Sequence, residues 1–301
     1  MAQWYSREAG GKFEGVFSLL LTPFHENGEV NWQAYDRYVE WQLERKPHGL
    51  FGVCGSSEMK WLTLEEREQL ASRAAKLAGN VPVVVTGNLG SDPASHGEKV
   101  KRMADTGAAA IVLVPPDGMG VDQQALGDYY AKLADSAPIP CLVYEWPMVQ
   151  AYLLDTEVYE QLANHHNVWG IKDTTCTREG IKGKIDAAPD SVVYQANHPY
   201  MLEAVRMGAR GIMAISSASS ADLVLDFWQK AIRQDPEAER LHRELVVLDS
   251  MLTGGGAYPM TSKLIAQLQG MDIGLTCRNP VRLKPDTAHA VKAWYTGGSR
   301  A

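Results

Sequence analysis

Eight short apolar runs alternate with longer amphipathic segments, and this order limits the fold more than any other feature. The runs cover residues 15–22, 49–54, 81–87, 109–115, 140–145, 168–173, 191–195 and 211–215. Most are continuously apolar, as in strands buried on both faces of a parallel sheet. Helix start signals lie between them, such as the capping box of Thr63 and Glu66. Eight βα units in series predict an α/β fold, a closed (β/α)8 TIM barrel rather than an open doubly wound sheet.

The chain is longer than such a barrel needs. It has 301 residues, whereas a barrel takes about 250. The helix after the eighth run should cover 221–233, and residues 236–253, 258–270 and 286–296 also carry helical spacing. We therefore expect an N-terminal extension over residues 1–12, a catalytic barrel over 13–233 and a C-terminal helical extension over 234–301.

Composition excludes several classes of partner. Lys and Arg total 29 against 36 Asp and Glu, so no basic surface is expected to bind nucleic acid. The longest apolar runs fall far short of the roughly 20 residues of a membrane span, and residues 1–12 lack the apolar core of a secretory signal. The four cysteines form no CxxC pair, which indicates reduced thiols. We expect a cytoplasmic protein without nucleic-acid or membrane partners.

Lys172 lies near the end of the sixth run. Because side chains alternate along a strand, Lys172 shares a face with Val168 and Gly170, while Trp169 and Ile171 suit the helix-facing side. Lys172 should then point into the barrel near its C-terminal rim, where such barrels hold their active sites.

Two interpretations fit this position. An enclosed lysine tends to have a lowered pKa, so its neutral amine can attack a carbonyl and form a Schiff base. Alternatively, Lys172 pairs with Glu58 or Glu145 and only holds the barrel together. Tyr144 ends the neighbouring fifth run, about 4.8 Å across, and its phenol could relay protons to a carbinolamine, which favours the first interpretation. Alternation points Glu145 away from Tyr144, toward the helices.

Small polar residues follow the second run at Gly55, Ser56 and Ser57. They allow a ligand to approach the backbone, and their hydroxyl and N–H groups can bind a carboxylate. Alone, such a sequence is common turn chemistry. Its combination with Tyr144 and Lys172 is far more specific.

Four segments resemble the dihydrodipicolinate synthase and N-acetylneuraminate lyase family in order and spacing, over roughly residues 13–290. They are Leu21-Thr22-Pro23, Gly55-Ser56-Ser57-Glu58, Tyr144-Glu145-Trp146-Pro147 and Gly170-Ile171-Lys172-Asp173. The resemblance implies a class I aldolase-type barrel in which Lys172 forms a Schiff base with a 2-oxo acid and needs no other cofactor. It further implies proton transfer by Tyr144 and binding of the substrate carboxylate by residues 55–57.

The chain departs from the family in the loop after the second run. The usual sequence is Gly-Thr-Thr-Gly-Glu or Gly-Ser-Thr-Gly-Glu, whereas Glu58 here follows the serines directly. An ungapped match places Gly55 and Ser56 on the paired hydroxyl positions, and a one-residue deletion places Ser56 and Ser57 there. Ser56 supplies a hydroxyl in both registers.

Two further departures lie after the fourth and fifth runs. The segment Pro116-Asp117-Gly118-Met119 stands where dihydrodipicolinate synthases have a pair of tyrosines, one of which completes their proton relay. Val149 or its neighbours replace the arginine of their pocket entrance. Both departures argue against a role in lysine biosynthesis and leave the Schiff-base residues intact.

Candidates for the distal end of the substrate follow the last two strands. Asn197 and His198 come after the seventh, where sugar-acid lyases of the family hold hydroxyls, and Ser216 or Ser217 after the eighth. For His198 a surface or capping role is the alternative. His165 and His166 have no third ligand at a known interval, so no metal site is expected.

We therefore expect a lyase that cleaves or dehydrates a 2-oxo acid, such as a 2-keto-3-deoxy sugar acid. Lys172, Tyr144 and Ser56 are the expected catalytic residues. Substrate-binding residues are expected at Gly55, Ser57, Asn197, His198 and Ser216. The alternatives are a dihydrodipicolinate synthase with an altered relay, which condenses pyruvate with aspartate semialdehyde, and a non-catalytic barrel that binds a 2-oxo acid. The resemblance also implies a homodimer or homotetramer.

Overall fold

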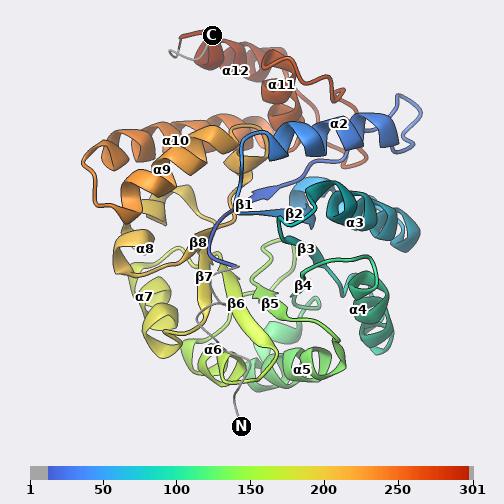
Figure 1. Ribbon diagram of the computed structural model, residues 1–301, viewed down its shortest axis with the longest axis vertical. Helices are drawn as coiled ribbons and strands as arrows, with labels where there is room; N and C mark the ends of the chain where they lie inside the picture. Colours follow the sequence, from blue (N-terminus) through green and yellow to red (C-terminus); the bar gives the residue numbers. More distant parts are fainter. Residues whose placement is uncertain (1–12, 298–301) are drawn as a thin grey trace.

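The computed structural model describes residues 13–297, which form a closed barrel of eight parallel strands (Figure 1). The strands are β1 (Gly15–Leu19), β2 (Gly49–Val53), β3 (Val83–Thr86), β4 (Ala110–Leu113), β5 (Cys141–Tyr144), β6 (Val168–Asp173), β7 (Val192–Gln195) and β8 (Gly211–Ile212). They follow one another in sequence order, and β8 pairs with β1 to close the ring. All eight predicted runs therefore form strands, and the predicted TIM barrel is confirmed.

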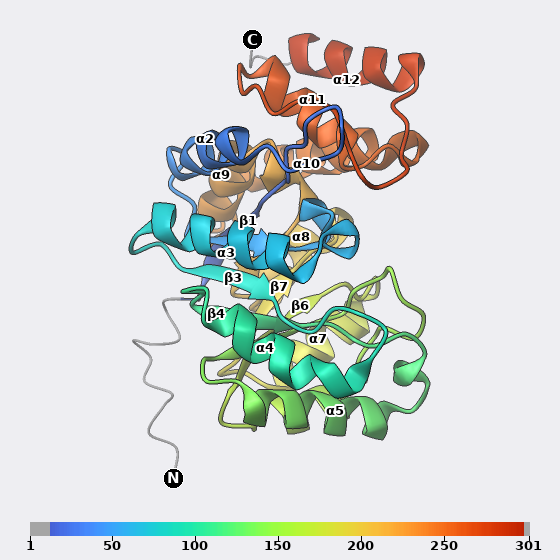
Figure 2. The same ribbon diagram turned by 90° about the vertical axis from the view of Figure 1, so that its right-hand side faces the viewer.

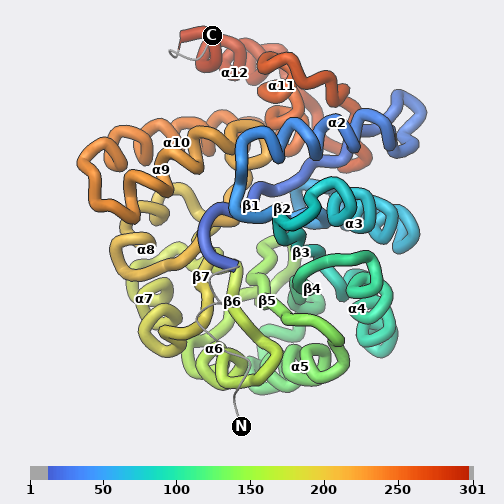
Figure 3. Tube along the Cα trace, viewed as in Figure 1, coloured from blue at the N-terminus to red at the C-terminus, as the bar shows by residue number. Residues whose placement is uncertain are grey.

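A helix follows each strand and packs on the outside of the ring (Figure 1). These helices are α2 (Trp32–Leu43), α3 (Leu64–Ala78), α4 (His96–Ala104), α5 (Gln123–Ser136), α6 (Thr156–Ala163), α7 (Arg178–Ala187), α8 (Met201–Met207) and α9 (Ala221–Ile232). The start signals act as expected at α3, where Thr63 and Glu66 form the capping box. Along the tube in Figure 3, each strand leads into its helix on the way around the ring.

Three more helices extend the barrel at the C-terminal end: α10 (Glu237–Thr253), α11 (Met260–Leu268) and α12 (Pro285–Gly297). Figure 2 shows α11 and α12 outermost, beyond α2 and α10. Buried residues of α10 and α11, among them Leu245 and Ile265, share one apolar cluster with α8 and α9. The division of the chain at residue 233 stays a prediction, and the predicted extension over 1–12 lies outside the described residues. No helix of the described chain is long and apolar enough to cross a membrane.

The strand order fixes which residues can meet inside the barrel. β5 and β6 are neighbours, and their register places Tyr144 directly beside Lys172. β2 is four strands away from β6, on the opposite side of the ring. Side chains from β2, β5 and β6 can therefore meet across the interior near the carboxyl ends of the strands, the face on which TIM barrels carry their active sites.

Candidate active site

Lys172 points into the barrel, as predicted. Its Nζ lies 4.2 Å from the centre of the Tyr144 ring on the adjacent strand. It also lies 5.3 Å from the centre of the Phe51 ring, which belongs to β2 across the barrel. Only 3% of Lys172 is exposed, so the amine is almost completely enclosed.

Neither Glu58 nor Glu145 pairs with Lys172. Glu145 bonds to Lys184 of α7, and its other oxygen accepts the Thr174 N–H at 2.9 Å. Glu58 bonds to Lys263 of α11 at 2.9 Å. Each carboxylate thus has another buried lysine as its partner, and within residues 13–297 no ion pair or hydrogen bond to the side-chain amine of Lys172 is found. The interpretation of Lys172 as a structural ion pair is therefore wrong.

The surroundings of Lys172 favour its neutral form. Burial lowers the pKa of Lys172 from 10.5 to about 8, since the charged amine loses hydration that no nearby carboxylate replaces. Lys184 is also buried, but the pKa of this lysine is raised, because Glu145 and Asp173 together outweigh the effect of burial. Of these two lysines in the barrel, only Lys172 is prepared to act as a nucleophile near neutral pH.

Tyr144 covers the amine with its ring. The side chain is 6% exposed, and burial raises the pKa of its phenol well above the ordinary value. Its hydroxyl has no hydrogen-bond partner among the described residues and is free to bond to a ligand. Glu145, the next residue, points outward to Lys184 and to the Leu154 N–H, as alternation predicted.

The loop after β2 presents two free peptide N–H groups. Gly55, Ser56 and Ser57 form a short 3₁₀ turn, and within the described chain no acceptor is found for the N–H of Gly55 or Ser56. The Ser57 hydroxyl is used inside the loop, where it donates to the Leu20 carbonyl at 2.6 Å. Thr22 holds the same loop by donating to the Ser57 carbonyl at 2.7 Å. Such free N–H groups at the start of a turn suit an anion.

Sequence reasoning missed Tyr258, which lies between α10 and α11. Its hydroxyl donates to Ser56 Oγ at 2.5 Å across 202 positions of sequence. Nothing in the local sequence around Tyr258 marks it as a site residue, because the contact depends on how the C-terminal extension folds back over the barrel. The Glu58–Lys263 ion pair is a second contact between this extension and the loop after β2.

The predicted distal residues lie close together. His198 is buried between Ser216, whose Oγ is 2.8 Å from Nε2, and Asp249 of α10, whose Oδ1 is 2.9 Å from Nδ1. The amide of Asn197 donates to the carbonyl of Thr174 at 2.8 Å. His198 is therefore not a surface residue, and its two ring nitrogens hold the end of β8 against α10.

The sequence profile of the dihydrodipicolinate synthetase family matches residues 12–293. The chain belongs to this family. It is therefore an enzyme, a lyase of the class I aldolase type, as the sequence resemblance implied.

Two curated relatives and one solved structure illustrate the range of this family. The 4-hydroxy-tetrahydrodipicolinate synthase of Brachyspira hyodysenteriae is 24% identical and covers 89% of this chain and 92% of the relative. A DapA-like lyase of Pyrobaculum arsenaticum, described as uncharacterized, is 28% identical over 87% of this chain and 91% of its own length. The crystal structure of YagE, a prophage protein of E. coli K12 in complex with pyruvate, has a TM-score of 0.88 at 20% identity, covering 95% of this chain and 98% of YagE.

A hollow lies beside the barrel mouth of this family member, between the loops that follow β2 to β5. Its volume is about 480 Å³, and its lining includes Lys60, Arg67, Asp117, Trp146 and Val149. Pro116 and Asp117 of the first departure noted in the sequence and Val149 of the second thus line the same hollow. Lys172 and Tyr144 are not among the residues that line this hollow.

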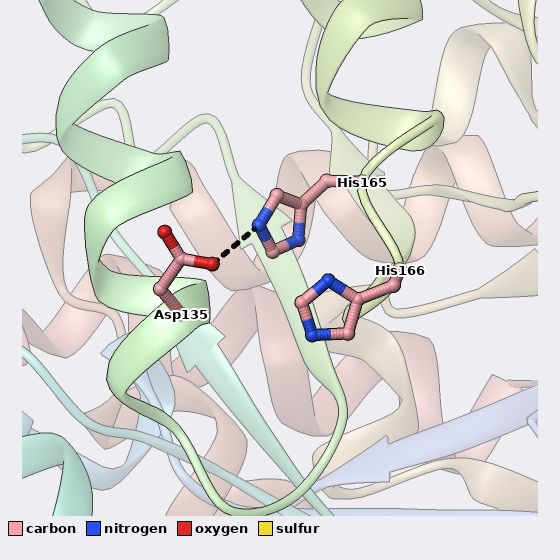
Figure 4. A group of neighbouring side chains, drawn as sticks. All are labelled: Asp135, His165 and His166. Atoms are coloured by element: carbon pink, nitrogen blue, oxygen red, sulfur yellow. Dashed lines mark hydrogen bonds and ion pairs between the residues drawn. The ribbon is translucent and has the colours of Figure 1, made fainter. Parts of the chain in front are cut away.

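A third residue does lie near His165 and His166, although their spacing revealed none. Asp135 Oδ1 is 3.0 Å from His165 Nε2, and the ligand atoms of all three residues lie within 4.8 Å of one another (Figure 4). His165 Nδ1 accepts the Asn167 N–H at 3.2 Å, which puts the proton of a neutral ring on Nε2, facing Asp135. In this arrangement His165 has no lone pair left for an ion. The group sits at the ends of α5 and α6, away from Lys172.

Proposed function

We propose that this lyase acts on a 2-oxo acid through a Schiff base on Lys172. The proposal depends most on the burial of this amine and on its lack of a carboxylate partner. It is enclosed in the barrel beside Tyr144, and both carboxylates that could hold it as a charged group are bonded to other lysines. Burial without a counter-ion keeps an amine nucleophilic, and carbonyl addition uses that property.

The loop after β2 supports binding of the substrate carboxylate. The N–H groups of Gly55 and Ser56 are free to donate, and a carboxylate bound there would leave the adjacent keto carbon to face the barrel interior. This favours the ungapped register, in which Gly55 and Ser56 occupy the paired positions. We assign Ser57 the narrower task of holding the loop, because its hydroxyl bonds to the Leu20 carbonyl.

The chemistry then follows from the groups around Lys172. The neutral amine attacks the keto carbon, and a proton moves from nitrogen to the former carbonyl oxygen. Tyr144 donates a second proton to this hydroxyl, which leaves as water and produces the protonated imine and a phenolate. A bond at C3 then breaks, and the imine accepts the electron pair that it releases. In aldol cleavage this is the bond from C3 to the neighbouring carbon, and in dehydration it is a C3–H bond. The phenolate takes up the proton that this step frees.

Asn197, His198 and Ser216 remain the proposed contacts for the distal part of the substrate. They follow β7 and β8 at the same rim of the barrel as Lys172. Both ring nitrogens of His198 are bonded, to Ser216 and to Asp249, so a substrate hydroxyl would have to replace one of these bonds. Asn197 is only half-buried, and amide, hydroxyl and imidazole groups suit a polyhydroxylated chain better than an apolar one. We therefore propose a 2-keto-3-deoxy sugar acid or a similar hydroxylated 2-oxo acid as the substrate class.

Borohydride trapping with pyruvate, read by mass spectrometry of the proteolytic peptides, tests the mechanism. We expect one reduced adduct on the peptide that carries Lys172, and none in Lys172→Ala. The absence of an adduct with pyruvate and with a panel of 2-oxo acids would refute the proposal. Turnover that disappears in folded Lys172→Ala would exclude a binding-only barrel.

Product analysis separates the possible reactions. A panel of 2-keto-3-deoxy sugar acids should release pyruvate if the enzyme cleaves its substrate, or a dehydrated oxo acid if it eliminates water. A parallel assay with pyruvate and aspartate semialdehyde tests condensation. Faster condensation than turnover of every sugar acid would replace our substrate class with that of a dihydrodipicolinate synthase.

The expected assembly and location stay proposals. We propose a homodimer or homotetramer, which sedimentation velocity of the full chain would test. A cytoplasmic location is also proposed, and fractionation of the source cells would test it.

A further inference from the structure

The Glu145 carboxylate joins three separate segments beside the reactive groups. One oxygen accepts the Leu154 N–H at 2.9 Å, and the other accepts the Thr174 N–H at 2.9 Å. Leu154 lies at the far end of the segment 146–154, which connects β5 to α6, and Thr174 directly follows β6. The Glu145 carbonyl also accepts the Thr174 hydroxyl at 2.7 Å. One buried residue therefore closes the segment 146–154, here called the entrance loop, and attaches it to the end of the strand that carries Lys172.

Lys184 of α7 fixes the position of this carboxylate. Its ammonium group donates to Glu145 and to the Thr175 hydroxyl, the latter at 2.6 Å, and it lies 3.2 Å from Asp173. All three charged side chains are buried. A buried charge is held firmly by its partners, because leaving them would cost hydrogen bonds that no water replaces. The Glu145 carboxylate is therefore a fixed point from which the entrance loop is closed.

A second residue holds the same end of the entrance loop from outside. Gln123, at the start of α5, donates to the Leu153 carbonyl at 2.9 Å and accepts the Asp155 N–H at 2.8 Å. The loop thus has one defined position, which is set by Glu145 on the barrel side and by Gln123 on the outer side.

The first half of the entrance loop lines the hollow beside the barrel mouth. Trp146, Met148 and Val149 all belong to that lining. Trp146 also reaches the loop after β2, where its indole nitrogen is 3.6 Å from the position that a Cβ would take on Gly55. These side chains move if the loop moves, so the shape of the hollow depends on how the loop is held.

The second half of the loop lies near the reactive groups. Burial raises the pKa of the Tyr152 phenol, and the Cys176 thiol adds to the rise. Burial likewise raises the pKa of Tyr144, and Tyr152 adds to it. Electrostatic effects fade over about 10 Å, so Tyr152 is close to Tyr144 and to Cys176. The Cys176 sulfur is in turn 3.0 Å from the amide nitrogen of Asn197, a proposed contact for the distal part of the substrate.

We propose that Glu145 is a positioning residue that determines specificity: by holding the entrance loop, it shapes the space for the part of the substrate beyond its 2-oxo acid group. This role rests on the proposed function and adds a residue that does not touch the substrate. Pyruvate ends at the methyl group next to its keto carbon and has no part that would reach the loop. A longer 2-oxo acid extends past Tyr144 toward Asn197 and has to fit against the loop. Glu145 should therefore matter for the longer acid and not for pyruvate.

Borohydride trapping at increasing concentrations of two acids tests this role, with pyruvate as the short acid and 2-keto-3-deoxygluconate as the long one. The half-saturating concentration of each acid measures its binding to Lys172, and adducts of the long acid are counted whether intact or cleaved. We expect wild type to bind the longer acid more tightly. In Glu145→Ala the longer acid should bind about 10-fold more weakly, the effect of about one lost hydrogen bond, while pyruvate binding changes by less than about twofold.

Asp173→Ala is a charge-matched control. Asp173 is the second carboxylate at Lys184, but its oxygens bond to the Thr175 N–H and the Gln195 amide instead of the entrance loop. Each variant leaves Lys184 with one carboxylate, so both remove the same charge and only Glu145→Ala releases the loop. We expect Asp173→Ala to keep the wild-type ratio of the two half-saturating concentrations.

Two further variants separate the loop from the ion pair. Glu145→Gln should recover most of the wild-type ratio, because its amide oxygen can still accept from Lys184 and from the Leu154 N–H. Gln123→Ala removes the bonds on the outer side of the loop and leaves every charge in place, so it should weaken binding of the longer acid selectively as well.

The outcomes are distinct. Wild type without a pyruvate adduct refutes the Schiff-base function. Wild type that traps pyruvate but binds the longer acid no more tightly overturns the role of Glu145 alone. So does an unchanged ratio in Glu145→Ala, which includes equal weakening of both acids, since the residue would then only support the strands. An equal selective loss in Asp173→Ala also overturns it, because the effect would belong to the ion cluster. Should Glu145→Ala fail to fold, Gln123→Ala decides, and an unchanged ratio there overturns the proposal.

Discussion

Replacing Lys172 with methionine should make the protein more stable. Burial disfavours the charged amine of Lys172, and no carboxylate compensates for it among the described residues. Methionine has a similar length, fills the same space and carries no charge. The gain measures how much stability the fold gives up to keep a reactive amine in this position, as is common at active sites.

The size of this stabilisation and its pH dependence follow from the pKa values of Lys172 in the folded and the unfolded chain. The pKa of Lys172 is about 8 in the folded chain against 10.5 for an ordinary lysine, which corresponds to about 3 kcal/mol. Because the folded-state pKa is the lower one, the unfolded chain binds more protons between these values, and the cost of folding falls as pH rises. The cost is present in full below about pH 8 and disappears near pH 10.5.

Urea unfolding of wild type and Lys172→Met at pH 7 and at pH 10 tests this reasoning. We expect the variant to have the higher free energy of unfolding at pH 7 by about 3 kcal/mol, and the difference to shrink at pH 10. Comparing the two proteins at each pH removes the contributions of all other titrating groups. Equal stabilities at pH 7, or a difference that does not depend on pH, would show that burial of Lys172 does not lower its pKa and does not destabilise the fold.

Further predictions concern the neighbouring groups. Lys184→Met and Lys263→Met should each lower the free energy of unfolding by about 3–5 kcal/mol, since each leaves a buried carboxylate without its cation; the same urea assay would contradict this if either were neutral. Tyr144→Phe should still form the trapped Lys172 adduct at equilibrium but turn over its substrate at least about 10²-fold more slowly, and unchanged turnover would remove Tyr144 from the mechanism. Adduct formation should speed up with pH and level off above about 8, where the amine of Lys172 is neutral; a rise that continues to 10.5 would show an ordinary lysine.

The sequence predicts the barrel well because the signal is local and repeated. Each strand is buried on both faces and appears as a continuous apolar run, and the intervening helices carry their own start signals. Alternation along β6 then places Lys172 inside the barrel, and strand adjacency places Tyr144 beside it, as the register of β5 and β6 shows. These inferences need only the period of a strand and the order of the units.

Contacts between segments that are far apart in the sequence cannot be predicted in the same way. The sequence offers Glu58 and Glu145 as possible partners of Lys172. It cannot show that Glu58 pairs with Lys263 and Glu145 with Lys184 instead. Lys184 points inward from α7 to reach Glu145, and Lys263 reaches Glu58 across 205 positions of sequence. Which lysine pairs with which carboxylate depends on how the helices pack against the strands, and the period of a strand does not contain that information.

The contacts of the C-terminal extension are a second case that the sequence alone does not predict. They also indicate a different role for the extension. Its length and helical spacing indicate a unit added to a barrel that is already complete, and by that view its residues should tolerate substitution. Tyr258, Lys263 and Arg278 instead bond to Ser56, Glu58 and Glu66, all in or just beyond the loop after β2. Free peptide N–H groups bind an anion only if the backbone that carries them is held in place. The extension fixes this loop from outside the barrel, so changes in helix α11 should affect substrate binding even though no residue of that helix lies inside the ring.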